Sequence, residues 1–159
     1  MSTLIQPRRI KTGARKRTFV IVASRFNREY VQGLIDHAST ELRALMPEAE
    51  ILLQSVPGAF EIPVVVREFA VHDRPDGIIA CGVILKGETS HADNLVRSVT
   101  DALQRIAVSH GVPVINAVLM FDNVAQAQER CLGDRINRGS EAGRAAADMV
   151  KTFAELRTS

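Results

Sequence analysis

Four short apolar runs alternate with amphipathic segments along this chain, and that order constrains the fold more than any other feature of the sequence. The runs are rich in β-branched residues and have the length of buried strands, at 18–23, 50–55, 76–83 and 113–119. The segments between and after them have helical spacing, at 28–45, 62–71, 91–110, 124–132 and 140–156. Near-continuous apolar strands that alternate with helices are typical of parallel sheets covered on both faces. We therefore expect an α/β fold, a three-layer α/β/α sandwich around a four-stranded parallel sheet.

Apolar residues on the predicted helices recur at spacings of three and four, which places them on one face of each helix. In the first helix they are Val31, Leu34, Ile35, Ala38, Leu42 and Leu45. The third and last helices carry Leu95, Val96, Val99, Leu103 and Ile106, and Ala142, Ala145, Ala146, Met149, Val150 and Phe153. We expect these faces to form the helical part of the core.

Charge divides the chain into a basic head and an acidic body. Of the 159 residues, 20 are Lys or Arg and 18 are Asp or Glu, and residues 1–28 hold eight of the basic residues and no acid. Because Arg25 and Arg28 lie beyond the first predicted strand, we assign a basic arm to 1–17 and a single domain to 18–159. The arm is open to three interpretations: a solvated terminus, a segment that docks on a partner subunit or an anionic surface, and a transit peptide. The early start of the first strand disfavours the third.

Composition disfavours several classes of protein. No stretch approaches the roughly 18 consecutive apolar residues of a membrane span, so we expect no membrane partner. Cys81 and Cys131 are far apart and the four histidines lack metal-ligand spacing, so we expect neither a disulfide framework nor a metal site. Unpaired cysteines favour the cytoplasm. Aromatic residues make up only 4% of the chain, too few for a base-stacking surface, so no nucleic-acid partner is expected.

Ligands of open parallel sheets bind at the carboxyl ends of the strands. Four loops leave those ends, at 24–27, 56–61, 84–94 and 120–123. The first loop contains no glycine, which argues against a phosphate-binding P-loop or a dinucleotide-binding turn. Its Phe26 either folds back on the first helix or offers a stacking surface to a flat heterocycle. Its Asn27 is expected to cap that helix.

The second loop combines small residues with an acid. Gly58 and Ala59 let backbone amides approach a ligand closely, and with Glu61 they suit a polyhydroxylated chain. The simpler interpretation is a strand-to-helix turn in which Glu61 is a favourable charge near the helix start.

The third loop predicts an anion site at the start of the helix 91–110. Ser90 and Asp93 fit a capping box, and the first amides of a helix bind anions, here with Thr89 beside them. His91 lies at the same position, where an imidazole can move protons near neutral pH. The other three histidines lie on helix bodies or ends, and we interpret them as structural.

Arg130 and Arg138 lie on and just after the fourth predicted helix. They are either part of a solvated surface, or one of them supplies the cation for a phosphate group.

Five segments carry a resemblance to a known family. They are Arg25-Phe26-Asn27, Pro57-Gly58-Ala59-Phe60-Glu61-Ile62-Pro63, Gly87-Glu88-Thr89-Ser90-His91, Glu129-Arg130 and Asn137-Arg138-Gly139-Ser140-Glu141. In this order and at these intervals they resemble the lumazine synthase (6,7-dimethyl-8-ribityllumazine synthase) family over residues 18–157. The resemblance implies a flavodoxin-like fold and a transferase of riboflavin biosynthesis. Such an enzyme condenses 5-amino-6-(D-ribitylamino)uracil with 3,4-dihydroxy-2-butanone 4-phosphate, releases phosphate and water, and uses no metal or organic cofactor.

The resemblance also implies roles for individual residues. Phe26 matches the ring that stacks on the pyrimidine, and His91 matches the proton-transfer residue. The segment for the ribityl chain is Ala59, Phe60 and Glu61, and the backbone that flanks the uracil is Val83, Ile84 and Leu85. The phosphate-binding positions are Glu88, Thr89 and Arg130. In the family the last of these comes from a neighbouring subunit, so the resemblance implies a homopentamer, with two pentamers back to back (a decamer) as a larger assembly.

Three departures from the family's pattern bear on function. Asn116, which we keep as a substrate-binding candidate, stands where the family often has an aromatic ring from the adjacent subunit. Arg138 replaces a lysine, and 132–136 also differs. Because losing a stacked ring weakens binding by about 1 kcal/mol, the alternative function is a lumazine- or flavin-binding or scaffold protein with weak or no catalysis. The resemblance favours an assembly role for the basic arm.

Overall fold

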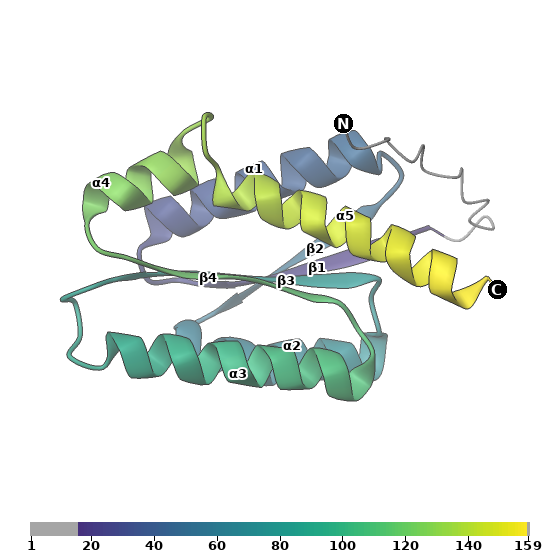
Figure 1. Cartoon of the computed structure of the whole chain (residues 1–159), viewed down its shortest axis with the longest axis horizontal. Coiled ribbons are helices and arrows are strands. Elements are labelled where there is room, and N and C mark those ends of the chain that lie inside the picture. The colour runs from purple at the N-terminus through teal and green to yellow at the C-terminus, as the bar shows by residue number, and fades with distance from the viewer. Residues whose placement is uncertain (1–15, 159) are drawn as a thin grey trace, which may run out of the picture.

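A computed structural model describes residues 16–158 of the chain, and one sheet of four strands lies at its centre. The strands β1 (Thr18–Ser24), β2 (Glu50–Val56), β3 (Gly77–Leu85) and β4 (Val114–Phe121) lie in the order β2-β1-β3-β4. Every neighbouring pair is parallel, so the predicted four-stranded parallel sheet is confirmed (Figure 1). Most of the predicted basic arm lies outside the described residues.

Helices cover both faces of the sheet. On one face lie α1 (Arg28–Leu45), α4 (Val124–Ala127) and α5 (Arg138–Arg157), and on the other lie α2 (Ile62–Glu68) and α3 (Ala92–His110) (Figure 1). The predicted three-layer α/β/α sandwich is therefore confirmed. In the part of the chain that the structure describes, no helix is long and apolar enough to cross a membrane.

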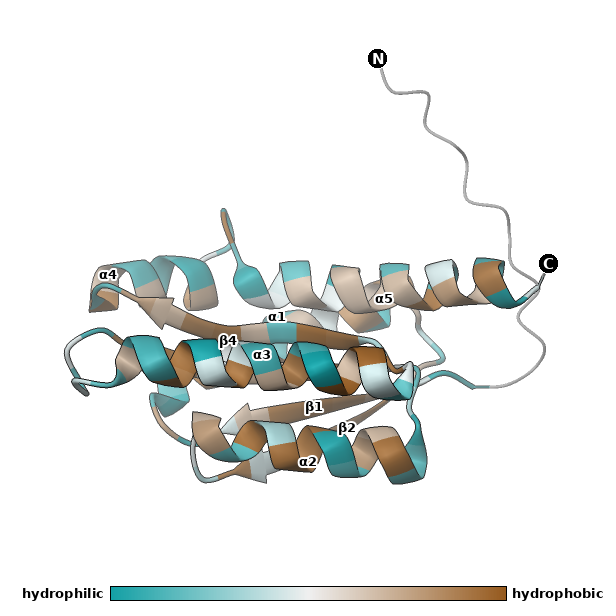
Figure 2. Cartoon of the chain, turned by 60° about the horizontal axis from the view of Figure 1, so that its bottom comes forward, coloured by the Kyte–Doolittle hydropathy of each residue, from teal (hydrophilic) through white to brown (hydrophobic). Residues whose placement is uncertain are grey.

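The sheet separates two apolar layers because side chains alternate along each strand. In β1, Phe19 and Ile21 pack into the layer formed with α1 and α5, whereas Val20 and Val22 pack into the layer formed with α2 and α3. Figure 2 shows the consequence: strands β1 and β4 are apolar along most of their length, while α2 and α3 alternate between apolar and polar residues.

The predicted helical faces form the core with exceptions on two helices: Leu45 of α1, and Ala145, Met149 and Phe153 of α5, which are half-buried and belong to neither core layer. Val31, Leu34, Ala38 and Leu42 of α1 are buried as expected, but Leu45 is 45% exposed. Leu45 is the last residue of α1, and Met46, which follows it, packs partly buried against the core in its place.

Two predicted helices are found over about their expected lengths, but each changes from α-helix to a π-helical turn at its end. The helix predicted over 62–71 is α-helical only to Glu68 and continues as η2 (Phe69–Asp73). The helix predicted over 124–132 divides into α4 and η3 (Gln128–Leu132). The wider turns are closed by five-residue hydrogen bonds, from Arg74 N to Phe69 O at 2.9 Å and from Gly133 N to Gln128 O at 3.1 Å.

Both cysteines are buried free thiols in the layer under α1 and α5. Burial raises the pKa of the Cys81 thiol to about 12 and that of the Cys131 thiol to about 11. A thiol that stays protonated at neutral pH is a poor nucleophile, so neither cysteine is suited to catalysis.

Helices α1 and α5 touch at Gly143, where a Cβ atom would lie only 2.6 Å from the carbonyl oxygen of Ala38. The change Gly143→Ala is expected to destabilise the fold by about 2–3 kcal/mol, because overpacking outweighs the roughly 1 kcal/mol that alanine gains in helix propensity. Chemical unfolding of the two proteins checks this, and an equal or higher stability of the alanine variant would contradict it.

Candidate active site

The carboxyl ends of the four parallel strands lie at one edge of the sheet. Strand register places Ser24 opposite Val56, Ala23 opposite Cys81 and Leu85 opposite Phe121, so the loops that follow leave the same edge. The loops after β1, β2 and β3 carry most of the residues proposed from the sequence, and we therefore place the candidate site there.

An exposed aromatic ring and a carboxylate both lie next to Gly58. A Cβ atom at Gly58 would lie 3.4 Å from Cε2 of Phe26 and 3.3 Å from Oε2 of Glu61. Phe26 is 68% exposed, so its ring does not fold into the packing of α1. Of the two interpretations of Phe26, the geometry supports a stacking surface.

The second loop forms a short 3-10 turn, η1 (Ala59–Glu61), before α2 begins. Ala59 is buried, whereas Phe60 is 71% exposed and Glu61 is exposed. Two exposed aromatic rings and an exposed carboxylate thus follow β1 and β2, and exposed apolar surface gathered at one edge marks a place where a ligand or a partner binds.

Asn27 connects the first loop to the third, and it takes the predicted N-cap position of α1 without the expected side-chain bond. It occupies the N-cap position of α1 in the left-handed conformation, with φ at 53°, and makes no side-chain cap bond. Its Nδ2 instead donates to the carbonyl oxygen of Val83 at 2.8 Å and to Oε2 of Glu88 at 3.2 Å. Asparagine tolerates this conformation better than other non-glycine residues, which is the signal that the sequence offered.

The last residues of β3 face the site with backbone groups that β1 does not pair. Pairing between β1 and β3 ends at Cys81, whereas pairing between β3 and β4 continues to Leu85. Val83 and Ile84 are buried and Leu85 is half-buried. Nδ2 of Asn27 already donates to the carbonyl oxygen of Val83. Since the side chains of this stretch are buried or half-buried, it offers main-chain hydrogen-bonding groups rather than side chains.

The start of α3 differs from the predicted capping box. The helix begins at Ala92 with His91 at the N-cap, one residue later than a box of Ser90 and Asp93 requires. The amide of His91 donates to Oγ1 of Thr89 at 3.2 Å instead. Glu88, Thr89 and His91 are all exposed at this end, where the helix dipole favours negative charge.

Arg130 and Asn116 lie apart from the other candidates. Both line a cavity of about 420 Å³ beside β4 and α5, together with Arg138. Strand β4 is one of the two edge strands of the sheet, and β3 separates it from β1. Asn116 is held there by two bonds, since its Oδ1 accepts from Val118 N at 3.0 Å and its Nδ2 donates to Oγ1 of Thr100 at 3.2 Å.

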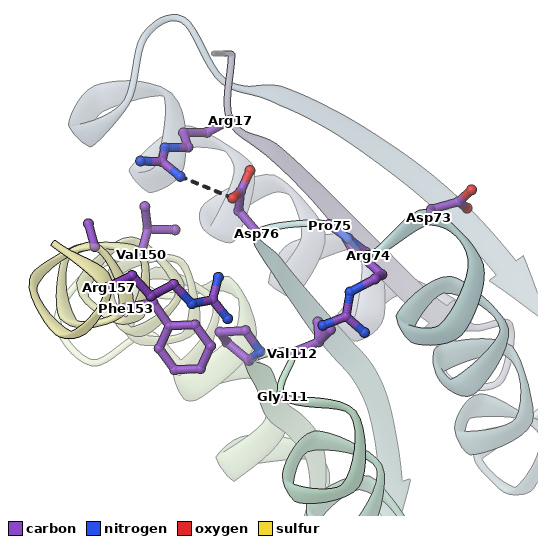
Figure 3. Close-up of a pocket in the computed structure, with 12 residues that line it drawn as sticks. Arg17, Asp73, Arg74, Pro75, Asp76, Gly111, Val112, Val150, Phe153 and Arg157 are labelled. Carbon is purple, nitrogen blue, oxygen red and sulfur yellow. Dashed lines mark hydrogen bonds and ion pairs between the residues drawn. The ribbon is translucent and has the colours of Figure 1, made fainter. Parts of the chain in front are cut away.

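A further cavity, of about 340 Å³, lies at the opposite, amino-terminal edge of the sheet and contains three arginines (Figure 3). Arg17 pairs with Asp76 at 3.2 Å, and Nη2 of Arg74 donates at 3.0 Å to the carbonyl of His110 at the end of α3. Arg157 stacks 4.8 Å from the ring centre of Phe153. Asp76, the carbonyl end of α3 and the Phe153 ring thus each hold one of the three arginines, so this cluster has a structural role.

Among residues 16–158, no group of three or more His, Cys, Asp or Glu side chains is placed to hold a metal ion.

The family model for 6,7-dimethyl-8-ribityllumazine synthase matches residues 16–154, nearly the whole described chain. The chain belongs to this family. A lumazine synthase of Polaromonas sp. strain JS666 is 35% identical over 147 residues, which cover 92% of this chain and 93% of the relative. That of Halorhodospira halophila is 37% identical over 139 residues, covering 87% and 89%. That of Leuconostoc mesenteroides subsp. mesenteroides is 34% identical over 139 residues, with the same coverage.

Membership of the lumazine synthase family confirms the resemblance and the fold class expected from the sequence. The individual site residues stay predictions, and the geometry divides them into two sets. Ten lie at the carboxyl edge of β1, β2 and β3: Phe26, Ala59, Phe60, Glu61, Val83, Ile84, Leu85, Glu88, Thr89 and His91. Two, Asn116 and Arg130, line the cavity beside β4.

Proposed function

We propose that this chain is the riboflavin-biosynthetic transferase that makes 6,7-dimethyl-8-ribityllumazine. Its substrates are 5-amino-6-(D-ribitylamino)uracil and 3,4-dihydroxy-2-butanone 4-phosphate, and phosphate and water are released without a cofactor. Family membership over residues 16–154 supports this. The observation that carries it is that Phe26 and Glu61 both lie against Gly58, while Asn27, next to Phe26, bonds the end of β3 at Val83.

In this proposal the uracil ring stacks on Phe26 and bonds to the backbone at the end of β3. Phe26 is exposed, and β3 continues past Cys81, its last residue paired with β1, so its end is not covered by β1. The ribityl chain lies along η1, where Glu61 accepts bonds from its hydroxyl groups.

Proton transfer is assigned to His91 because the condensation needs several proton movements and no strong nucleophile. The 5-amino nitrogen attacks the ketone carbonyl, and water leaves to form an imine. Phosphate is then eliminated, and the ribitylamino nitrogen closes the ring with loss of a second water. Positioning of the two substrates supplies much of the rate enhancement.

Phosphate is held by the main-chain amides of Glu88 and Thr89 and those that begin α3 on one side, and by Arg130 of a neighbouring subunit on the other. Within one subunit Arg130 lines the cavity beside β4, and β3 separates β4 from β1, the strand that Phe26 follows. We therefore propose that each site is shared between subunits of a homopentamer, with a decamer as a larger form, in the cytoplasm. Leu52 and Leu53 on edge strand β2, about half exposed, are further surface for a partner subunit to cover.

A turnover assay with both substrates separates this function from the alternative, a lumazine- or flavin-binding or scaffold protein. Asn116 favours that alternative, since it lacks the ring that the family often has there. Lumazine absorbance that grows with time supports the enzyme. Riboflavin or lumazine binding in a fluorescence titration, without any product from an assembled oligomer, would support the alternative.

The basic arm, residues 1–17, is proposed to strengthen assembly by lying on the acidic body of a neighbouring subunit. Deleting residues 1–15, which keeps the ion pair of Arg17 with Asp76, is expected to lower the oligomer mass at low protein concentration and to lower Tm. Light scattering and thermal unfolding measure both. An unchanged mass and an unchanged Tm would contradict an assembly role.

A further inference from the structure

One buried amide joins the turn that carries Arg130 to the helix that begins with Arg138. Asn137 is 6% exposed. Its Nδ2 donates to the carbonyl oxygen of Cys131 at 3.1 Å and to that of Gly133 at 2.9 Å. Its Oδ1 accepts from the amide of Ser140 at 3.0 Å, which caps α5. Each of its three bonds thus goes to the main chain of a different residue.

These bonds close the end of η3. The last carbonyls of a helical turn have no partner within the helix, and Asn137 supplies one for both Cys131 and Gly133. Arg130 precedes Cys131 directly, and Arg138 follows Asn137. Both arginines line the same cavity of about 420 Å³ beside β4, so the amide lies at the junction between them.

Close packing around Asn137 leaves it little freedom to move. A Cβ atom at Gly139 would lie 3.0 Å from its Oδ1 and 2.6 Å from the carbonyl oxygen of Leu34 in α1. A Cβ atom at Gly33 would lie 2.5 Å from the carbonyl oxygen of Cys131. Helix α1 therefore packs against the same turn, η3, that the Asn137 amide bonds. The main chain beside Arg130 is held both by this packing and by the hydrogen bonds of Asn137.

We propose that Asn137 is a positioning residue that holds Arg130 in the orientation in which it binds the phosphate group of the butanone substrate. This rests on the proposed function. An amide is the side chain that donates twice and accepts once with this geometry, whereas aspartate lacks the donors and serine has only one hydroxyl. A residue that only capped α5 would need the acceptor alone.

The test separates the two jobs of Asn137 with Asn137→Ser. Serine keeps an oxygen able to cap α5 but loses the two donations to Cys131 and Gly133. The matched control is Asn123→Ser, because Oδ1 of Asn123 caps α4 by accepting from Gln126 N at 2.9 Å. We expect Asn137→Ser to raise KM for the phosphorylated butanone about tenfold and to change KM for the ribitylaminouracil less than twofold. The control is expected to change neither KM by more than about twofold.

A double variant shows whether the effect runs through Arg130. In an Arg130→Ala background, Asn137→Ser is expected to change the remaining kcat/KM by less than about twofold. Effects that multiply in the double variant, or equal changes in both KM values, would overturn the proposal and leave Asn137 as a stabilising cap.

Inorganic phosphate distinguishes this proposal from the proposed function. Calorimetry on the assembled wild-type oligomer and on Asn137→Ser is expected to show phosphate binding that is about tenfold weaker in the variant. That difference supports the positioning role even if the wild type makes no lumazine, which would overturn only the proposed function. Equal affinities, or no phosphate binding by the wild type, would overturn the positioning role.

Discussion

Replacing Arg130 with alanine is expected to lower kcat/KM for the phosphorylated butanone by about 100-fold or more, since each charge-assisted hydrogen bond contributes about 1.5–3 kcal/mol. KM for the ribitylaminouracil is expected to stay within about threefold, because that substrate carries no phosphate and lies on the loops after β1 and β2. Steady-state kinetics with each substrate varied in turn measure both effects.

Arg144→Ala is the matched control for this prediction. Arg144 lies on α5, is exposed, and pairs with Glu41 at 3.1 Å outside the cavity that Arg130 lines. We expect its removal to leave both KM values unchanged, since exposed ion pairs contribute little. An Arg130→Ala enzyme with wild-type kinetics for the phosphorylated substrate would exclude Arg130 from the site.

The change His91→Ala is expected to lower kcat by about 10²- to 10⁴-fold, the usual contribution of one positioned acid or base. Both KM values are expected to change little, because stacking and phosphate binding stay in place. His72→Ala is the control, since His72 is an exposed histidine of η2 that pairs with Glu68 at 3.4 Å. A His91→Ala enzyme with undiminished kcat would show that another group moves the protons.

The two variants together test whether sites are shared between subunits. Each of them is nearly inactive alone, but subunits unfolded, mixed in equal amounts and reassembled are expected to regain activity. A site that takes His91 from one subunit and Arg130 from the next is intact in about one case in four for random mixing around a ring. No recovery in a correctly assembled mixture would mean that both residues act within one subunit.

The arrangement of the elements could be predicted from hydrophobic spacing, because a parallel sheet buries its strands on both faces. The predicted strand 50–55 is observed as β2, although four consecutive residues of it, Leu52 to Ser55, are exposed at the edge of the sheet. Its β-branched and aliphatic residues were sufficient to predict a strand, even though most of them are not buried. Helix ends were less predictable. Helical spacing placed Leu45 in the core, but the tertiary packing buries part of Met46 instead.

The two π-helical turns could not be predicted from spacing. An extra residue in a turn leaves the apolar pattern of three and four almost unchanged over a short segment. In η3 the close approach of α1 is possible because Gly33 has no side chain, with Cys131 O only 2.5 Å from where a Cβ would lie. Such a contact joins residues nearly a hundred positions apart, which no local pattern reports.

The site residues that lie in loops directly after the strands could be predicted from the sequence. Contacts that depend on the local conformation of a side chain or turn were less predictable. Phe26, Glu61 and His91 lie in the loops where parallel-sheet logic placed them. Asn27 occupies the expected N-cap position of α1, but with its backbone in the left-handed conformation its side chain bonds Val83 and Glu88 rather than the helix. Asn137 was part of a recognisable segment, but its three bonds depend on how η3 and α5 meet.

The central claim is that this chain forms a lumazine from its two substrates, and one measurement tests it directly. The purified oligomer is mixed with 5-amino-6-(D-ribitylamino)uracil and 3,4-dihydroxy-2-butanone 4-phosphate, while lumazine absorbance and free phosphate are followed together. The account predicts lumazine and phosphate released in equal amounts, at a rate proportional to protein and well above that of the substrates alone. A rate equal to the uncatalysed reaction, from a folded and assembled protein, would contradict it.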